Sequence, residues 1–456
     1  MRVLHKVPPR LREKNEQAYD PSIVSLGPYH HRQPQCREFE ELKDDLVDIM
    51  LKADHRRHLF RTDILARIGD IRHFYGGLSR DEYDDEALAE MMLRDACVVL
   101  YFVEITAANE EGEENRMEKA MFLIERLGAF QWYLVAIDVN KLENQIPWWL
   151  IKSLIKSTYD GDKKEEGEAL MLRFLSLLTS GDLTKLKQLP WYLVRDEYFP
   201  LHLLEAIRIT SLVNPEDLNI NNLRDLNRHG LQNAVIANAN ETETTTSKCC
   251  KWWRRKSYAA AGGSFQFHQP GKRPFRSVTE LKAKGIHFKP SSDFLVDIRF
   301  DSYYFFGVLH LPVLGISKDD RITFLNMVAL EMSPGTPCPD RMVTSYLALM
   351  KSMIGDSKDV KALQEKGIIV SFVGESEEVV RIFKEIDSYG FENFEVFDVI
   401  KMRINEHCNS KAKTWIAELI NTKFHSPWTT IALFAAAFLL CLTFLQTYYT
   451  MNPRKT

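Results

Sequence analysis

The sequence predicts a mainly α (α+β) protein: a multi-helix body with a small antiparallel β meander and a single C-terminal transmembrane helix. Three observations predict this architecture. Apolar residues recur at helical spacing over residues 36–212 and again over 319–421. Between these parts, short runs rich in aromatic and branched residues occur in 286–316. An uncharged apolar stretch of membrane-spanning length follows near the end of the chain.

The helical part begins with an amphipathic helix over 36–68, in which residues such as Phe39, Leu42 and Leu46 share one face. A second helix, over about 81–106, is nearly continuous in apolar character at ACVVLYFVEI, which is typical of a buried central element. The spacing predicts further helices near 117–128, 142–157, 165–179, 198–212, 319–332, 340–354, 357–366, 375–388 and 392–421, with Asp340 and Ser357 as N-caps.

Residues 214–275 change character. Little apolar periodicity survives between 238 and 274, so this stretch is expected to be a low-complexity, disordered basic loop. The runs IHF, FLVDIRF and FFGVLHLPVLGI follow and predict the β meander. The predicted organisation is an N-terminal helical part (7–237), the loop (238–274), a C-terminal α+β part (275–421), the transmembrane helix (428–448) and a short basic tail (449–456).

Composition excludes some classes of protein. The 456 residues carry a formal net charge of −4, so no global field attracts nucleic acid, and none is expected as a partner. The seven cysteines are odd in number and form no CxxC pair, which favours reduced thiols over a disulfide framework. The N-terminus shows no apolar run of signal-peptide length.

The apolar stretch WTTIALFAAAFLLCLTFLQTYY is uncharged and bounded by aromatic residues, as membrane spans are. The alternative is a buried core helix. The charges that flank the stretch are nearly balanced, but the absence of a signal peptide favours tail-anchored insertion with the body in the cytosol. The residues predicted to form the anchor are Trp428, Phe434, Leu439, Leu440, Leu442, Phe444 and Tyr448.

The predicted loop holds a second membrane-related feature, a run of five basic residues, two tryptophans and two cysteines. It suggests contact with an anionic leaflet or acylation, against the plainer interpretation of a solvated basic loop. The run begins at Lys248 and continues with Cys249, Cys250, Lys251, Trp252, Trp253, Arg254, Arg255 and Lys256. Asn240 begins an N-x-[ST] sequon that is a glycosylation site only if the body is extracytoplasmic.

Several segments occur in an order that carries a family resemblance: KVPPRLREKNEQAYDPSIVSLGPYHH, MMLRDACVVLYFVEI, KLENQIPWWLIKSL, SVTELKAKGIHFK, FLNMVALE, DVKALQEKGII and the PW-initiated C-terminal stretch. Together they resemble the plant membrane-protein family catalogued as domain of unknown function 247, from about residue 7 to 449. The chain departs from the usual pattern at Arg32, where a glycine often follows the paired histidines, and in starting almost at the first motif.

The resemblance implies a mainly helical plant protein with a C-terminal membrane helix and no established enzymatic activity. Some relatives are implicated in self-recognition of pollen in grasses, which implies a role in recognition or signalling. The family has no known catalytic residues, so none is carried over to this chain.

A search for catalytic chemistry is largely negative, since the motifs of hydrolases, nucleotide-binding enzymes, zinc proteases and calcium sites are absent. His30 and His31 are weak metal candidates, because adjacent histidines in an extended segment point to opposite sides; rings packed around the N-terminal segment are favoured instead. Asp95 is expected to pair with Arg94 or to cap a helix, and Asn144 or Gln145 to satisfy helix ends.

We therefore predict a membrane-anchored protein that acts in recognition or signalling by binding another protein. The alternative is a membrane-tethered enzyme of unknown chemistry. The sequence indicates no catalytic residue, no metal ligand and no cofactor, and the expected partners are the bilayer and a protein.

Overall fold

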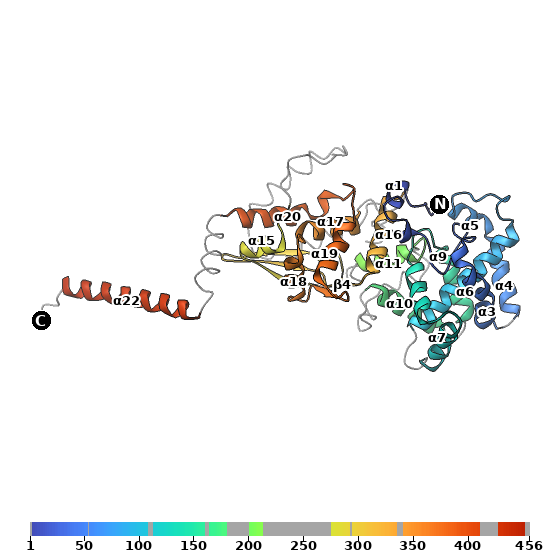
Figure 1. Ribbon diagram of the computed structural model, residues 1–456, viewed down its shortest axis with the longest axis horizontal. Coiled ribbons are helices and arrows are strands. Elements are labelled where there is room, and N and C mark those ends of the chain that lie inside the picture. The colour runs from blue at the N-terminus through green and yellow to red at the C-terminus, as the bar shows by residue number, and fades with distance from the viewer. Residues whose placement is uncertain are drawn as a thin grey trace.

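The computed structural model describes residues 2–52, 54–107, 113–159, 164–179, 200–212, 275–291, 294–334, 341–410 and 427–451. The described chain is mainly helical with a small β component, as predicted. Figure 1 shows the N-terminal helices at one end of an elongated molecule, the strands and later helices in the middle, and α22 at the other end.

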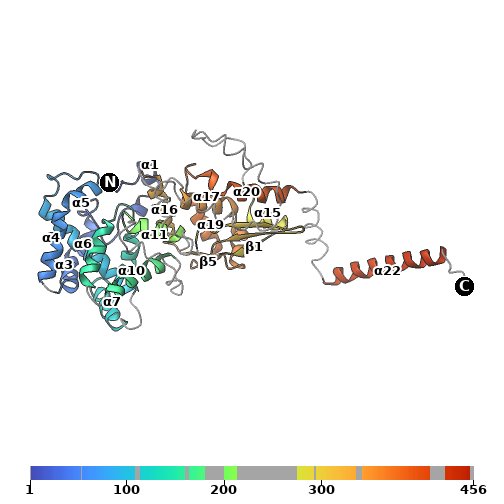
Figure 2. The same cartoon turned by 180° about the vertical axis from the view of Figure 1, so that it is seen from behind.

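The N-terminal helices pack around one central helix, α6 (Asp85–Ala107). Between Leu88 and Ile105 nearly every side chain of α6 is buried, which confirms the prediction of a central element. Figure 2 shows α6 among its neighbours from the opposite side. The other elements of this part are α1 (Pro9–Arg12), α2 (Glu16–Tyr19), η1 (Pro34–Cys36), α3 (Arg37–Met50), α4 (Asp54–Ala66), α5 (Ile68–Phe74), α7 (Glu113–Leu127), α8 (Ala129–Asp138), α9 (Trp148–Thr158), α10 (Lys164–Thr179) and α11 (Leu203–Leu212).

The single helix predicted over 36–68 is wrong in extent. The helix ends at Met50, with Leu51 as its C-cap, and a new helix begins at Asp54. Both α3 and α4 lie against α6. One straight helix of that length could not fold back onto α6 in this way, so tertiary packing overrides the continuous periodicity.

Seven further helices follow in the part of the chain described from residue 275 on, and the last of them lies apart from the body. They are α15 (Val278–Ala283), α16 (Asp320–Met332), α17 (Met342–Met353), α18 (Ser357–Gln364), α19 (Ser376–Glu385), α20 (Phe394–Asn409) and α22 (Pro427–Met451). The N-cap of α18 is Asp356 and not Ser357: its carboxylate accepts hydrogen bonds from the N–H groups of Lys358 and Asp359 in a capping box. Asp340, the other predicted N-cap, lies outside the described residues.

The strands form two small sheets, and the predicted antiparallel meander is wrong. The strands are β1 (Ile286–Pro290), β2 (Arg299–Ser302), β3 (Gly307–Leu311), β4 (Leu314–Ile316) and β5 (Ile369–Ser371). Strand β3 lies between β1, to which it is parallel, and β2, to which it is antiparallel. Strand β4 pairs in parallel with β5, which no expected strand run included.

The physical reason is the break in FFGVLHLPVLGI. Pro312 lacks an N–H group for a ladder, and the run is divided there between two sheets. One face of the larger sheet is apolar and buried, with Phe288, Phe300 and Leu309 on it. Helix α20 packs against β2 on this sheet.

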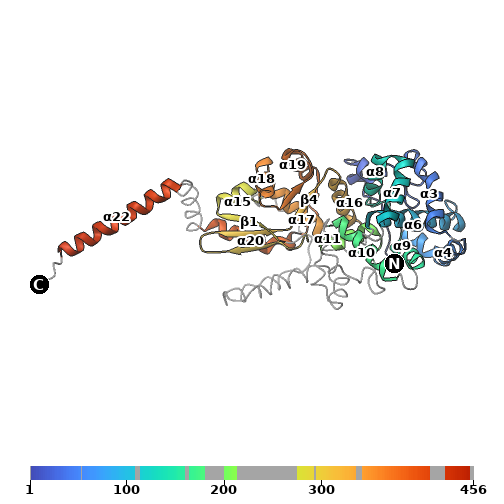
Figure 3. The ribbon, with the colours of Figure 1, turned by 90° about the horizontal axis from the view of Figure 1, so that it is seen from below.

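Helix α16 joins the two parts of the body. The amide of Asn326, which is fully buried, accepts a hydrogen bond from Leu142 N–H (2.8 Å) and donates to the carbonyl oxygen of Ala18 (2.9 Å). Figure 3 shows α16 and α11 between the N-terminal helices and the strands. The N-terminal segment and the α+β part are therefore connected by packing and by buried hydrogen bonds.

Candidate functional site

Charged and amide side chains gather inside the N-terminal half, where the chain from residue 4 to 31 crosses the loop after α8. We call this cluster the polar junction. Its members are Lys43, Asp95, Asp138, Lys141, Glu143 and Asn144, each at most 4% exposed. Burying so many polar groups requires partners for each of them, because an unpaired buried charge is costly.

Asp138, at the end of α8, holds the extended segment that follows α2. Its carboxylate accepts hydrogen bonds from three successive backbone N–H groups, those of Ser22, Ile23 and Val24, at 2.7–3.1 Å. The ammonium of Lys141 lies 3.0 Å from the same carboxylate and donates to the carbonyl oxygen of Asp20. The carboxylate thus acts as a clamp on the backbone.

Asn144 and Gln145 extend this clamp and satisfy helix ends, as predicted. The Asn144 amide accepts from Leu26 N–H (2.6 Å) and donates to the carbonyl oxygen of Asp138, the last residue of α8 (3.0 Å). Gln145 donates to the carbonyl oxygens of Val139 and Lys141 after α8, and accepts from Leu204 N–H in the first turn of α11.

Asp95 does not pair with Arg94, so that prediction is wrong. Asp95 and Arg94 are adjacent on a helix and point to different sides, and Asp95 instead lies 2.6 Å from the Lys43 ammonium and accepts from Gly27 N–H (2.7 Å). Arg94 pairs with the exposed Asp44. Burial raises the pKa of the Asp95 carboxyl, and Lys43 opposes that shift.

Glu143 anchors the start of the chain. Its carboxylate accepts hydrogen bonds from Val7 N–H and from the Arg12 guanidinium, both at 2.6 Å, and lies 3.3 Å from the Nε2 atom of His30. Burial alone would raise the pKa of the Glu143 carboxyl, but His30, Arg12 and the Val7 N–H group outweigh burial and hold the pKa below its usual range. The carboxylate therefore stays ionised and occupied.

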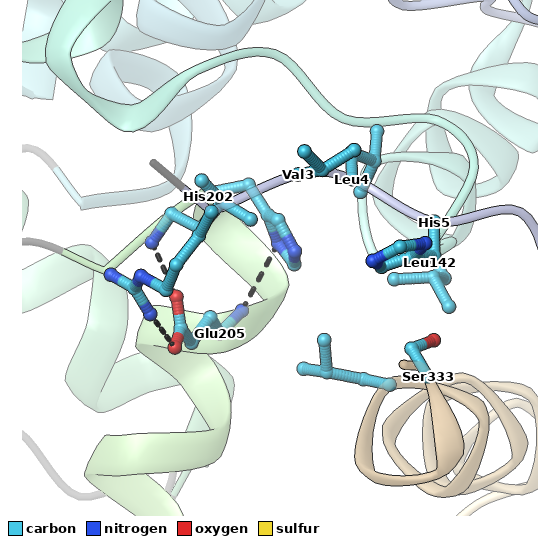
Figure 4. A pocket seen from close by; sticks show the side chains of 10 residues that line it. Val3, Leu4, His5, Leu142, His202, Glu205 and Ser333 are labelled. Carbon is cyan, nitrogen blue, oxygen red and sulfur yellow. Dashed lines mark hydrogen bonds and ion pairs between the residues drawn. The ribbon is translucent and has the colours of Figure 1, made fainter. Parts of the chain in front are cut away.

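A pocket of about 300 Å³, which includes space open to solvent, lies beside the polar junction. Figure 4 shows that its walls come from the N-terminal segment, from the start of α11 and from Ser333 after α16. The residues that line it are Arg2, Val3, Leu4, His5, Leu142, Leu201, His202, Glu205, Leu330 and Ser333.

His202 is the most perturbed titratable group of this pocket. Its Nδ1 atom accepts the Glu205 N–H (3.3 Å), as an N-cap side chain does, so its proton sits on Nε2. Burial, with a smaller effect of Arg2, lowers the pKa of His202 to about 3. Glu205 is occupied by Arg2 (2.5 Å) and by Leu201 N–H. A neutral imidazole and a paired carboxylate form no acid–base couple poised near neutral pH.

Comparison with known proteins shows to which protein family the chain is related. Residues 4–442 match the family profile described as plant protein of unknown function, domain of unknown function 247. The chain belongs to this family. Two curated Arabidopsis thaliana relatives are each 23% identical: UPF0481 protein At3g47200, with 97% of this chain and 85% of the relative covered, and Putative UPF0481 protein At3g02645, with 98% and 89% covered. No solved structure matches.

Three of the motifs that carried the resemblance to domain of unknown function 247 meet in the polar junction. VSLGPYHH supplies the backbone that Asp138 and Asn144 hold, LENQIP supplies Glu143 and Asn144, and MMLRDACVVLYFVEI supplies Asp95. In this family member these segments are therefore explained by folding. Lys43 and Asp138 have no direct signal in the sequence, because the groups that they hold, the Asp95 carboxylate and the backbone N–H groups of residues 22–24, are far from them in the chain.

The paired histidines pack around the N-terminal segment, as favoured. The Nδ1 atom of His30 lies 2.8 Å from the Gln33 amide, and the His31 ring stands edge-on to Tyr83. Among the described residues, no three His, Cys, Asp or Glu side chains are arranged to hold a metal ion.

The predicted loop sites lie outside the described residues. These are the basic run from Cys249 to Lys256 and the sequon at Asn240. Nothing in the geometry above involves them, and both stay predictions.

The predicted transmembrane helix is only partly matched by the structure. Over the residues that the structure describes, no single helix is long and apolar enough to cross a membrane. Helix α22 contains a shorter apolar stretch, Ala435–Tyr448. At ~1.5 Å per residue these 14 residues rise about 21 Å, less than the ~30 Å of a hydrocarbon core. Helices α7 and α8 pass the same test only as a pair, bent by 103° between Leu127 and Ala129.

Large apolar side chains of α22 are exposed. Leu440 and Phe444 are 71% and 73% exposed, and Leu439, Leu442 and Tyr448, which were predicted to form the anchor, are exposed as well. Trp428 and Phe434 belong to the same helix. Figure 1 shows α22 lying apart from the body.

Proposed function

We propose that this protein is a plant recognition or signalling protein that is attached to a membrane by α22 and acts by binding another protein. The observation that carries the proposal is the exposure of apolar side chains along α22, together with the engagement of the buried charged groups of the polar junction in structural contacts. Exposed apolar surface of this extent marks a contact with lipid or protein.

The apolar stretch of α22 is by itself too short to cross a bilayer, so the proposed anchor includes residues of the helix outside this stretch. The helix has 25 residues, from Pro427 to Met451, and at ~1.5 Å per residue it rises about 37 Å, enough for a hydrocarbon core of ~30 Å. The residues that precede Ala435 read PWTTIALF and carry no charge. Trp428 and Tyr448 would then lie near the two headgroup levels, where aromatic rings are favoured.

Binding is favoured over catalysis by the state of the buried carboxylates. Asp138 and Glu143 are engaged by backbone N–H groups and cations, and neither faces the pocket that His202 lines. The alternative function, a membrane-tethered enzyme of unknown chemistry, rests on that pocket, which holds one neutral imidazole and one paired carboxylate.

The orientation that we propose places the body in the cytosol, with the run from Cys249 to Lys256 against the anionic leaflet. Protease treatment of intact microsomes from plant cells tests it: an N-terminal tag should be digested, and endoglycosidase should leave the mobility unchanged because Asn240 carries no glycan. A protected tag and a glycan at Asn240 would place the body on the other side.

Chemical cross-linking of the tagged full chain in intact plant membranes tests the binding function. A recognition protein should give a discrete adduct with a defined partner. The enzyme alternative is favoured instead if no discrete adduct forms and if His202→Asn abolishes the biological activity without affecting folding.

A further inference from the structure

Four consecutive aromatic residues form the turn between β2 and β3. We call Tyr303, Tyr304, Phe305 and Phe306 the aromatic tip. They are 51%, 85%, 54% and 39% exposed, whereas Phe300, three residues earlier on β2, is 2% exposed. No charged residue occurs between Ser302 and Gly307. The tip is therefore a compact, uncharged, aromatic surface.

The residues of the aromatic tip are not those usually found in hairpin turns. Hairpin turns favour Gly, Asn, Asp and Pro, because these residues tolerate the required backbone angles or bond to the backbone. None of them occurs within the tip. A site where the residue choice opposes the local structural preference is a candidate for function.

The hairpin that carries the tip is well ordered by its contacts. Tyr303 N–H donates to the carbonyl oxygen of Phe306 (2.9 Å), and the two rings stack with their centroids 4.9 Å apart. The Phe300 ring lies so close to Gly307 that a Cβ atom there would stand 2.8 Å from it. The outer two aromatic residues thus brace each other, and Tyr304 and Phe305 extend from a rigid base.

The tip lies at the same end of the body as the chain that leads to α22. Ser302 Oγ is 2.8 Å from Nδ1 of His407, in the last turn of α20. Helix α20 ends at Asn409 and α22 begins at Pro427, so 17 residues separate them, a reach of at most ~60 Å when fully extended. Figure 3 shows the sheet end of the body facing the side on which α22 lies.

Basic side chains also lie near this end. The guanidinium of Arg276 donates to the amide oxygens of Asn405 and Asn409 at the end of α20. Lys284 directly precedes Gly285, whose carbonyl accepts the Gly307 N–H at the base of the hairpin. Burial raises the pKa of the Cys408 thiol, and both of these cations oppose the shift, which places their charge near the end of α20.

We infer that the aromatic tip inserts Tyr304 and Phe305 into the headgroup level of the bilayer to which α22 is attached, so that the sheet end of the body rests on the membrane. This inference rests on the proposed membrane attachment by α22. Tyr and Phe suit that level because their rings combine an apolar body with a polar or polarisable edge.

The bilayer is preferred over a protein as the occupant for a geometric reason. An anchor that begins 17 residues after α20 confines the end of α20, against which the hairpin of the tip packs, to within ~60 Å of the start of α22, so the tip is on a part of the body that can reach the membrane. Among the other exposed aromatic side chains, Phe130 on α8 is 72% exposed but belongs to the opposite end of the molecule, and Phe372 and Phe391 are single residues outside the hairpin that packs against α20.

The test uses the full chain reconstituted in vesicles of phosphatidylcholine and phosphatidylserine. A photoreactive benzoylphenylalanine replaces Tyr304 in one sample and Leu59, a 54% exposed residue of α4 at the far end of the body, in the control. Flotation first measures whether the protein is bound to the vesicles. Irradiation and mass spectrometry then measure lipid adducts at each position.

We expect both proteins to float and lipid adducts to form at position 304 at least tenfold more often than at position 59. If the proteins float but form no lipid adducts at position 304, or form them in equal yield at both positions, the inferred insertion of the aromatic tip is wrong and the proposed anchor stands. Adducts to protein alone at 304 would also overturn it and indicate a protein partner. Failure of both to float would overturn the anchor, and the inference with it.

Discussion

The two ends of this molecule differ in which side chains are buried and which are exposed. In the N-terminal half, charged groups that normally face water are buried in the polar junction, where Asp95 is 1% and Asp138 0% exposed. At the sheet end and on α22, aromatic and aliphatic groups that normally lie inside are exposed, with Tyr304 at 85%. The buried charges are each explained by contacts within the chain. The exposure of Tyr304 and Phe305, whose rings contact each other, is not explained by packing within the described chain.

This difference indicates where function resides. The segments that make the family recognisable from sequence, such as VSLGPYHH and LENQIP, are those that the polar junction occupies. Their residues hold backbone N–H groups and helix ends in place, which is a folding role. Of the two exposed apolar surfaces, α22 contains the PW-initiated motif of the family, whereas no family motif includes the aromatic tip. The following experiments test this division between a structural and a contacting end.

Removal of α22 should have the largest effect. A chain truncated before Pro427 loses all the exposed apolar side chains of the helix. We expect the truncated protein to move from the membrane pellet to the supernatant after alkaline carbonate washing, while the full chain stays in the pellet. If the truncated protein behaves as an integral membrane protein, α22 is not what attaches it to the membrane, and the role assigned to the exposed apolar end is wrong.

Asp95→Ala should cause a large loss of stability. The substitution removes the buried carboxylate that pairs with the Lys43 ammonium and accepts from Gly27 N–H, and it leaves Glu40, whose side chain is 16% exposed, as the remaining carboxylate beside Lys43. Breaking a buried pair in this way costs ~3–5 kcal/mol of the free energy of unfolding. Chemical denaturation of the truncated body and its variant measures the loss.

The matched control is the neighbouring pair on the surface of the same helices. Asp44, 60% exposed, pairs with Arg94, and Asp44→Ala should change the free energy of unfolding by at most ~1 kcal/mol. Equal losses for the two variants would show that the polar junction contributes no more than a surface pair.

Some of this division could be predicted from the sequence. The buried centre of α6, the occupation of helix ends by Gln145 and the packing of His30 follow from patterns within short segments. The Lys43–Asp95 pair could not be predicted, because its members are 52 residues apart and the adjacent Arg94 is the more obvious partner. The mixed sheet was also missed, because alternation predicts strands but not which strands pair.

Other features had a local signal. Ser277 and Glu280 form the capping box of α15, and the spacing S-x-x-E is visible in SVTE, yet no helix was predicted there. The aromatic tip is visible as YYFF, but Phe305 and Phe306 begin the predicted strand run FFGVLHLPVLGI, in which such residues indicate a core. Only the hairpin geometry shows that the strand ends at Ser302 and that these side chains are exposed.

Acid should destabilise the protein through His202. Its pKa in the folded chain, about 3, lies below the ~6.5 of an unfolded histidine. The unfolded chain therefore binds a proton that the folded chain does not, so the stabilisation is complete above pH ~6.5 and is lost as pH falls from there toward 3. For this residue the free energy of unfolding should fall by up to ~1.4 kcal/mol per pH unit, about 2 kcal/mol between pH 6.5 and 5.

His202→Asn isolates this contribution, because asparagine keeps an acceptor at the start of α11 and does not titrate. Denaturation at pH 7 and pH 5 should show a smaller pH dependence in the variant than in the parent. Glu143, with its lowered pKa, adds an acid loss of the same sign, but only as pH falls below the ordinary range of a carboxyl group. Identical slopes for parent and variant would show that His202 is accessible to protons in the folded chain.

The smallest effect on stability is expected at the aromatic tip. This experiment tests most directly whether the exposed apolar residues are needed for folding. Tyr304→Ser with Phe305→Ser removes two large rings from a hairpin whose ladder, stacking pair and Gly307 contact stay in place. Because both rings are more than half exposed, their loss should change the free energy of unfolding by no more than ~0.5 kcal/mol. Phe300→Ala on the same hairpin removes a ring that is 2% exposed and should cost ~3–5 kcal/mol. Denaturation of all three proteins in the absence of lipid measures both values. A large loss for the serine variant would mean that the tip serves folding after all, since a surface kept for an external contact should cost the isolated fold almost nothing to remove.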